Sequence, residues 1–157
     1  MPNQKKGTLP TIILGFDFGM KSIGTAIGQA ITRTATPLKT LTAKDGIPNW
    51  DEIKTLIIEW RPRALIVGIP LNMDGTEQPL TVLARRFMNR LKARYQLPVY
   101  AVDERLTTWE AKSYASTREK GMNSKKPSKS KSHAIAAAII VEQWFNAKTS
   151  NLNEREP

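Results

Sequence analysis

The sequence predicts an α/β protein built on a mixed sheet, and three observations lead to this fold class. Three strand-like segments near the N-terminus are joined by very short connections, which makes them antiparallel neighbours. Two later strand-like segments each follow a segment of helical periodicity, which places them parallel in the same sheet. The last helix is apolar around most of its circumference, so it must pack on that sheet. We therefore expect a five-stranded mixed sheet, three strands antiparallel and two reached by parallel crossovers, flanked by helices.

The size and composition of the chain fit one domain over residues 1–157. With 157 residues and 40% hydrophobic composition, we expect a core from about 11 to 147 and flexible tails at 1–10 and 148–157. The chain has no cysteine, which excludes disulfides, thiolate zinc sites and cysteine nucleophiles. We find no signal peptide and no apolar segment long enough to span a bilayer, so we expect no membrane association and a cytoplasmic location.

The chain is strongly basic, with 24 Lys and Arg against 14 Asp and Glu and a formal net charge of +10. Such an excess attracts polyanions, and nucleic acid is the usual polyanionic partner of a small basic protein. An acidic membrane surface is the competing partner. No segment combines a large apolar face with a lysine-rich one, so nucleic acid is favoured.

The first strand, within Thr11–Gly19, places one acid inside an apolar run. Ile12–Phe16 shows no polar alternation, which is typical of a strand buried on both faces. Asp17 therefore lies at the edge of a core, where a carboxylate costs several kcal/mol unless it is neutralised, paired or coordinated. Metal coordination is one explanation, since Gly19 predicts a turn that leaves the acid accessible. The structural alternative is that Asp17 caps its own turn through backbone hydrogen bonds.

The middle of the chain alternates between the two kinds of element. Strands are predicted at Ile23–Gly28 and Ile31–Thr42, followed by a helix between Pro48 and Pro62 and a buried strand at Ala64–Ile69. A second helix is predicted over Leu80–Tyr95, after an exposed loop. Its outward face is basic, which indicates either phosphate contacts or an ordinary solvated surface. The basic residues concerned are Arg85, Arg86 and Arg90.

The fifth strand, Val99–Val102, runs directly into Asp103 and Glu104. Because successive residues of a strand point to opposite faces, only one of these two acids can face Asp17. The other reading of Asp103 is a local ion pair with Arg105, worth under about 1 kcal/mol if exposed.

The C-terminal third combines two predicted helices with a polar segment. A short helix is expected over 107–118 and a final helix from His133 to about 147. Between them, residues 119–132 are rich in Lys and Ser and low in apolar content, which predicts a mobile basic loop. Its candidate phosphate-binding residues are Lys125, Lys126, Lys129 and Lys131, and Lys21 and Arg105 are candidates elsewhere in the chain.

Three segments together resemble one known family. FDFGMKSIGTAIGQ at 16–29, VGIPLNMDGTEQ at 67–78 and DERLTTWEA at 103–111 are similar to the motif blocks of the YqgF family, also called RuvX. The resemblance covers most of the chain from about 11 to 145. It implies a ribonuclease H-like fold and a nuclease, either one that matures the 5′ end of pre-16S ribosomal RNA or a Holliday junction resolvase. It also places an acidic ligand within the DER block at 103–105.

Phosphodiester hydrolysis by divalent ions needs clustered carboxylates, and Mg²⁺ keeps several waters, so two or three carboxylates suffice. Asp17 and Glu104 are the expected pair, with Asp103 as the alternate. In the usual strand order of this fold the two strands concerned lie about 10 Å apart, so Glu104 must lean across the strand between them. Relatives in the family typically carry an aspartate at the start of the last helix, where this chain has His133.

His133 leaves two interpretations open. An imidazole ligand suits Mn²⁺ better than Mg²⁺, so we expect a site for Mg²⁺ or Mn²⁺ formed by Asp17, Glu104 and His133. A histidine at a helix start is otherwise a structural residue. The corresponding functions are a metal-dependent nuclease acting on pre-rRNA or branched DNA, and a non-catalytic nucleic-acid-binding protein that has lost a ligand. Both a monomer and a weak dimer are compatible with the sequence.

Overall fold

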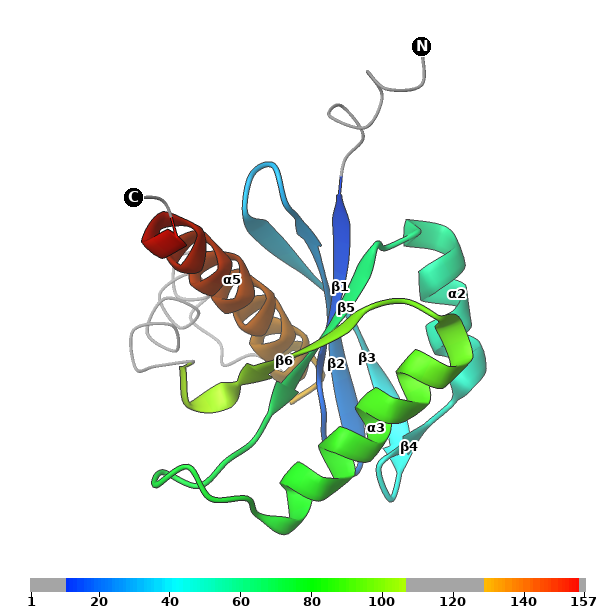
Figure 1. Cartoon of the computed structure of the whole chain (residues 1–157). Helices are drawn as coiled ribbons and strands as arrows, with labels where there is room; N and C mark the ends of the chain where they lie inside the picture. The colour runs from blue at the N-terminus through cyan, green and yellow to red at the C-terminus, as the bar shows by residue number, and fades with distance from the viewer. Residues whose placement is uncertain (1–10, 107–128, 156–157) are drawn as a thin grey trace, which may run out of the picture.

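The computed structural model of the chain describes residues 11–106 and 129–155. Within them, a six-stranded mixed sheet separates two layers of helices, with α2 and α3 on one face and α5 on the other (Figure 1). The strands are β1 (Ile12–Asp17), β2 (Ser22–Gln29), β3 (Thr34–Lys44), β4 (Ile47–Pro48), β5 (Ala64–Ile69) and β6 (Val99–Asp103). The helices are α2 (Trp50–Trp60), α3 (Pro79–Tyr95), the 3₁₀ turn η1 (Glu104–Leu106) and α5 (Lys129–Arg155).

The strand order is β4-β3-β2-β1-β5-β6. β1, β2 and β3 form the predicted antiparallel meander, and β5 and β6 add in parallel, so β5 lies between β1 and β6. The mixed α/β fold is confirmed. The expected count of five strands is low by one, because Asp45 and Gly46 both adopt positive φ and turn the chain back to pair β4 with β3. An Asp-Gly pair is a recognised hairpin signal.

The face of the sheet toward α2 and α3 holds the larger and more aromatic core. Phe16 and Phe18 project from the end of β1 and meet Phe87 of α3 with ring centroids 5.4 Å apart in both pairs. Leu14, Ile53 and Leu91 are fully buried in the same cluster. Large side chains fill most of the space between these two helices and the strands.

The face toward α5 is lined by small residues instead. A Cβ atom built on Gly15 or Gly28 would overlap Val141, and one on Gly24 would overlap the backbone of His133. Ala26, Ala137 and several other alanines belong to this second core cluster. Because these positions lack bulk, α5 lies directly against the strands.

Helix α5 is longer than the sequence predicts at both ends. It begins at Lys129, four residues before His133, and continues to Arg155 through residues 148–155, which we expected to form a tail. The proposed mobile loop therefore ends before Lys129. The helix expected at 107–118 and the remainder of that loop, including Lys125 and Lys126, lie outside the described residues. None of the described helices is both long and apolar enough to cross a bilayer.

Candidate active site

The site is organised around Asp17, the last residue of β1. Alternate residues of β1 contact the two layers in turn: Ile13 and Gly15 face α5, so Asp17 faces α5 as well. Its side chain is 17% exposed, which leaves the carboxylate accessible from one side only. In register beside it are Gly24 on β2 and Gly68 on β5, so neither neighbouring strand covers it with a side chain.

Glu104 reaches Asp17 across β5 because Gly68 has no side chain. Val102 packs on the α5 face, and Glu104 follows it by two residues to the same face. A Cβ atom on Gly68 would lie 2.9 Å from Glu104 Oε1 and 3.1 Å from its Cγ, so the Glu104 side chain lies directly over this glycine. The Glu104 side chain thus spans the distance between β6 and β1 by passing over Gly68.

His133 approaches Asp17 from the other side. Its Nδ1 lies 3.5 Å from Asp17 Oδ2, and its side chain is 38% exposed. The approach depends on Gly24, because any Cβ there would overlap the carbonyl of His133 and push the start of α5 away from the sheet. His133 is the fifth residue of α5, so its orientation is fixed by a formed helix rather than by a terminal cap.

Burial gives Asp17 unusual electrostatics. Loss of hydration raises its pKa to about 6, and a hydrogen bond with the Glu104 side chain opposes part of that shift. The two carboxyl groups therefore lie close together in a poorly hydrated place, where a second negative charge is unfavourable. A divalent cation would supply the missing positive charge, and two adjacent carboxylates are a suitable donor set for Mg²⁺ or Mn²⁺. The residues present therefore fit a divalent metal.

The described residues contain no group of three Asp, Glu or His side chains already arranged around an ion position. The geometry is instead a close Asp17–Glu104 pair with His133 beside Asp17. Two carboxylates and several waters satisfy Mg²⁺, so the pair alone is sufficient as a starting site.

Asp103, the alternate acid, points away from Asp17 and pairs with Arg105. The carboxylate Oδ2 and Arg105 Nη2 are 2.6 Å apart, and this hydrogen-bonded pairing lowers the pKa of Asp103. Arg105 Nη1 also donates to the carbonyl of Met73, 3.2 Å away, at the tip of the loop between β5 and α3. The structure thus places Asp103 in the local ion pair that the sequence offered as its alternative role.

The basic candidates are not gathered around Asp17. Arg85, Arg86 and Arg90 are exposed on α3, on the opposite side of the sheet, and Arg85 pairs with Glu77 at 3.2 Å. Lys21 is exposed in the turn after β1, only four residues from Asp17. Lys129 and Lys131 belong to the first turn of α5, which the sequence analysis treated as loop.

Sequence reasoning missed the two glycines that make the site possible. Gly24 and Gly68 sit inside strands, where glycine is unfavourable and marks a close approach by another part of the chain. That signal was present in the segments IGTAIG and ALIVGI. Their pairing on either side of Asp17 required the strand register, which the sequence alone does not supply.

Comparison with known proteins identifies the family. The family model described as RuvX: Holliday junction resolvase matches residues 11–147, and the chain belongs to this family. A relative from Haemophilus ducreyi named "Putative pre-16S rRNA nuclease" is 54% identical over 138 residues, covering 88% of this chain and 98% of its own. A relative of the same name from Shewanella oneidensis is 53% identical over 133 residues, covering 85% and 92%.

Solved structures show the fold. Thermus thermophilus RuvC in complex with a Holliday junction substrate aligns with a TM-score of 0.55 at 17% identity, covering 88% of this chain and 96% of its own. The yeast mitochondrial Holliday junction resolvase Ydc2 aligns with a TM-score of 0.55 at 12% identity, covering 92% and 82%. The fold is ribonuclease H-like, as the sequence resemblance implied.

Proposed function

We propose that this chain is a cytoplasmic, metal-dependent endonuclease that hydrolyses phosphodiester bonds in structured nucleic acid, and that its substrate is the 5′ end of pre-16S rRNA. The observation that carries the proposal is the Asp17–Glu104 pair, held over Gly68 at the carboxyl end of the central strand β1. Family membership and the names of relatives that share more than half of their aligned residues support the substrate class.

In this proposal each of the three site residues has its own role. Asp17 and Glu104 would hold a divalent cation, which supplies an activated water and charge stabilisation for the leaving oxygen. Glu104, the longer of the two acids, would adjust its position to the substrate. His133 would either join them as a ligand or hold a proton at Nδ1 beside Asp17 Oδ2. An imidazole in the first arrangement favours Mn²⁺ over Mg²⁺.

A second substrate, a DNA junction, has support of its own. The family model carries the description Holliday junction resolvase, and the RuvC structure contains such a junction. Backbone recognition carries little base information, so the substrate must be tested directly. Cleavage of a precursor 16S rRNA fragment but not of a four-way DNA junction supports the proposal, and the reverse supports the alternative.

The metal site is tested by isosteric changes. Asp17→Asn and Glu104→Gln should each abolish cleavage and keep nucleic-acid affinity, because each removes a charge at nearly constant volume. Asp103→Asn is the matched control, since this acid faces Arg105 instead, and it should keep activity within about threefold. Residual activity within about tenfold of wild type in Asp17→Asn would exclude the proposed site.

The role of His133 separates the enzyme from a non-catalytic binding protein. If it is a ligand, His133→Asp should raise Mg²⁺-supported cleavage and reduce any preference for Mn²⁺, and His133→Ala should lower cleavage in both metals. Unchanged turnover in both variants would assign His133 a structural role. A protein that binds nucleic acid but takes up neither metal in a calorimetric titration would instead be the non-catalytic binder.

A further inference from the structure

A cavity of about 470 Å³ lies between α2 and α3, on the face of the sheet opposite Asp17. Its walls combine apolar side chains, Ile57 and Ile58 among them, with the rings of Trp50 and Tyr95. Ile58 is 64% exposed, which is unusual for an isoleucine on a helix that already packs on a core. The cavity is therefore an apolar surface open to solvent.

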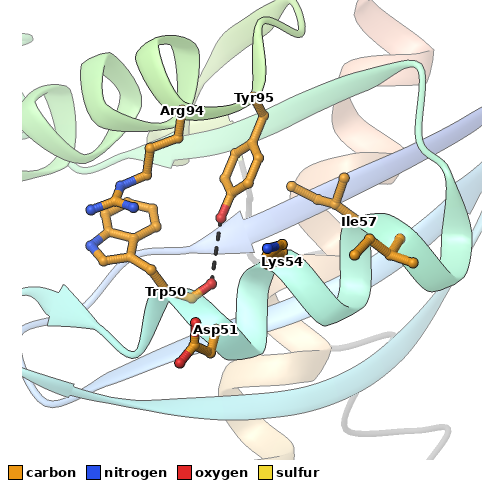
Figure 2. Close-up of a pocket in the computed structure, with 7 residues that line it drawn as sticks. Trp50, Asp51, Lys54, Ile57, Arg94 and Tyr95 are labelled. Carbon is orange, nitrogen blue, oxygen red and sulfur yellow. Dashed lines mark hydrogen bonds between the residues drawn. The ribbon is translucent and has the colours of Figure 1, made fainter.

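Stacked side chains lead from the core to the edge of this cavity. Trp50 stacks on Phe87 with ring centroids 5.9 Å apart and an interplanar angle of 24°. The guanidinium carbon of Arg94 lies 4.1 Å from the centroid of the Trp50 ring, as Figure 2 shows. Tyr95 joins the end of α3 to the start of α2, because its hydroxyl donates to the Trp50 carbonyl at 3.4 Å. Arg94 is thus a planar, exposed cation whose orientation is set in advance.

Arg94 also ends a row of arginines along α3. Arg86, Arg90 and Arg94 are spaced four residues apart, all three are exposed, and the row spans about 12 Å. Within the described residues, no carboxylate forms an ion pair with any of them, whereas the adjacent Arg85 is paired with Glu77. Like charges four residues apart destabilise a helix, so the row has a cost that a polyanion would remove.

We propose that this row and the cavity form a second nucleic-acid site, which binds a single-stranded stretch of the substrate. Successive arginines of the row are about 6 Å apart along the helix axis, so the row can contact a few consecutive phosphates of one extended strand. Arg94 then offers the free face of its guanidinium to a base, which extends the stack that begins at Phe87. Lys54 adds a cation at the cavity rim. Asp51 is the one acid among the residues that line the cavity, and it repels phosphates, so we expect the phosphates to follow α3.

This inference rests on the proposed function for its substrate class, and it adds where a flanking strand is held. The strand would lie on the α2 and α3 face while cleavage occurs on the α5 face, so the site contributes affinity and not chemistry. Variants of the row should therefore raise KM and leave kcat unchanged. That separation distinguishes the second site from the catalytic one.

Binding is measured with wild-type protein in excess chelator, using a short single-stranded RNA, the same strand in a duplex, and an abasic strand of equal length. Arg86→Gln with Arg90→Gln should lower the salt dependence of single-strand binding by about 1.4, at about 0.7 per phosphate contact. Arg94→Lys keeps the charge but loses the plane, so it should weaken binding of the base-bearing strand about fivefold and leave the abasic strand unchanged. Arg33→Gln, in the turn between β2 and β3, is the control for a positive charge removed elsewhere on the surface and should have neither effect.

Equal losses in Arg33→Gln and in the α3 variants would overturn the inference, because they would mean a response to net charge alone. Unchanged binding by all the α3 variants would also overturn it. A shift in oligomeric mass caused by Arg94→Gln, without any change in binding, would assign the cavity to contact with a second copy of the chain. Since no metal is present in these measurements, each result is independent of whether the protein cleaves.

Discussion

The two faces of the sheet are built from opposite kinds of residue. Toward α2 and α3 the contacts are made by large rings, with Phe87 touching Phe16, Phe18 and Trp50. Toward α5 glycine and alanine make many of the contacts, and Gly24 and Gly68 flank Asp17, whose side chain is 17% exposed. The face toward α2 and α3 is stabilised by the large apolar area that it buries. The face toward α5 buries less area per residue, and its small residues allow α5 to approach the strands closely.

The difference shows how a small domain accommodates a carboxylate pair. Burial raises the pKa of Asp17 to about 6, so a charged Asp17 opposes folding at neutral pH. Burial of the aromatic side chains on the opposite face of the sheet offsets this destabilisation. Residues that stabilise the fold and the residues proposed to perform chemistry therefore lie on opposite faces of the sheet. Substitutions on the two faces should have different consequences.

The largest expected effect is on the aromatic face. Phe87→Ala should lower the free energy of unfolding by about 3–5 kcal/mol, because it removes a fully buried ring that joins α3 to β1. Denaturant unfolding measures the loss. Cleavage by the folded fraction at low temperature should remain close to wild type. A loss of metal affinity in the folded variant would show that the two faces are not independent.

On the other face, Gly24→Ala and Gly28→Ala form a matched pair. The added methyl at Gly24 meets the backbone of His133, which cannot rotate away, so we expect a loss of about 3 kcal/mol. At Gly28 it meets the side chains of Val141 and Phe145, which have freedom to adjust, so we expect about 1–2 kcal/mol. Equal losses in thermal unfolding would show that α5 shifts as a rigid body.

Asp17 should make the metal-free protein less stable as pH rises. Its folded pKa of about 6 exceeds the usual 3.8, so the folded state binds more protons between these values and stability falls through that window. Asp17→Asn should remove this loss and stabilise the protein by about 3 kcal/mol above pH 7, with no gain below pH 4. Urea unfolding in chelator across this range measures it. A pH-independent difference would contradict the assigned cause.

The smallest expected effect is at the ion pair that ends β6. Asp103→Asn leaves Arg105 its contact with the carbonyl of Met73, and the pair is partly exposed, so we expect a loss under about 1 kcal/mol. The stability loss should shrink further in high salt. A loss comparable to that of Asp17 variants in cleavage assays would mean that Asp103 acts in the site after all.

Much of this arrangement was predictable from periodicity, and some was not. The buried run before Asp17, the parallel crossovers and the alternation that separates Asp103 from Glu104 are local patterns, and the structure agrees with each. The start of α5 at Lys129 was missed because a Lys- and Ser-rich segment has no apolar period to detect. The roles of Gly24 and Gly68 were missed because they depend on register. The cavity at Trp50 and Arg94 joins residues far apart in sequence.

The central claim is that Gly68 allows Glu104 to join Asp17 in a metal-dependent site, and Gly68→Ala tests it most directly. Cleavage and calorimetric Mn²⁺ binding should be measured on the same preparation, with Gly28→Ala as the control for overpacking on the same face. The added methyl would lie 2.4 Å from Ile140 Cδ1 and 2.9 Å from Glu104 Oε1, so both side chains must move. Moving Glu104 out of its place over Gly68 should lower cleavage, by about 100-fold if the shift approaches about 1 Å, and weaken Mn²⁺ binding, while unfolding changes no more than in Gly28→Ala. Cleavage and Mn²⁺ affinity both within about threefold of wild type, a margin well under that 100-fold, would contradict the claim.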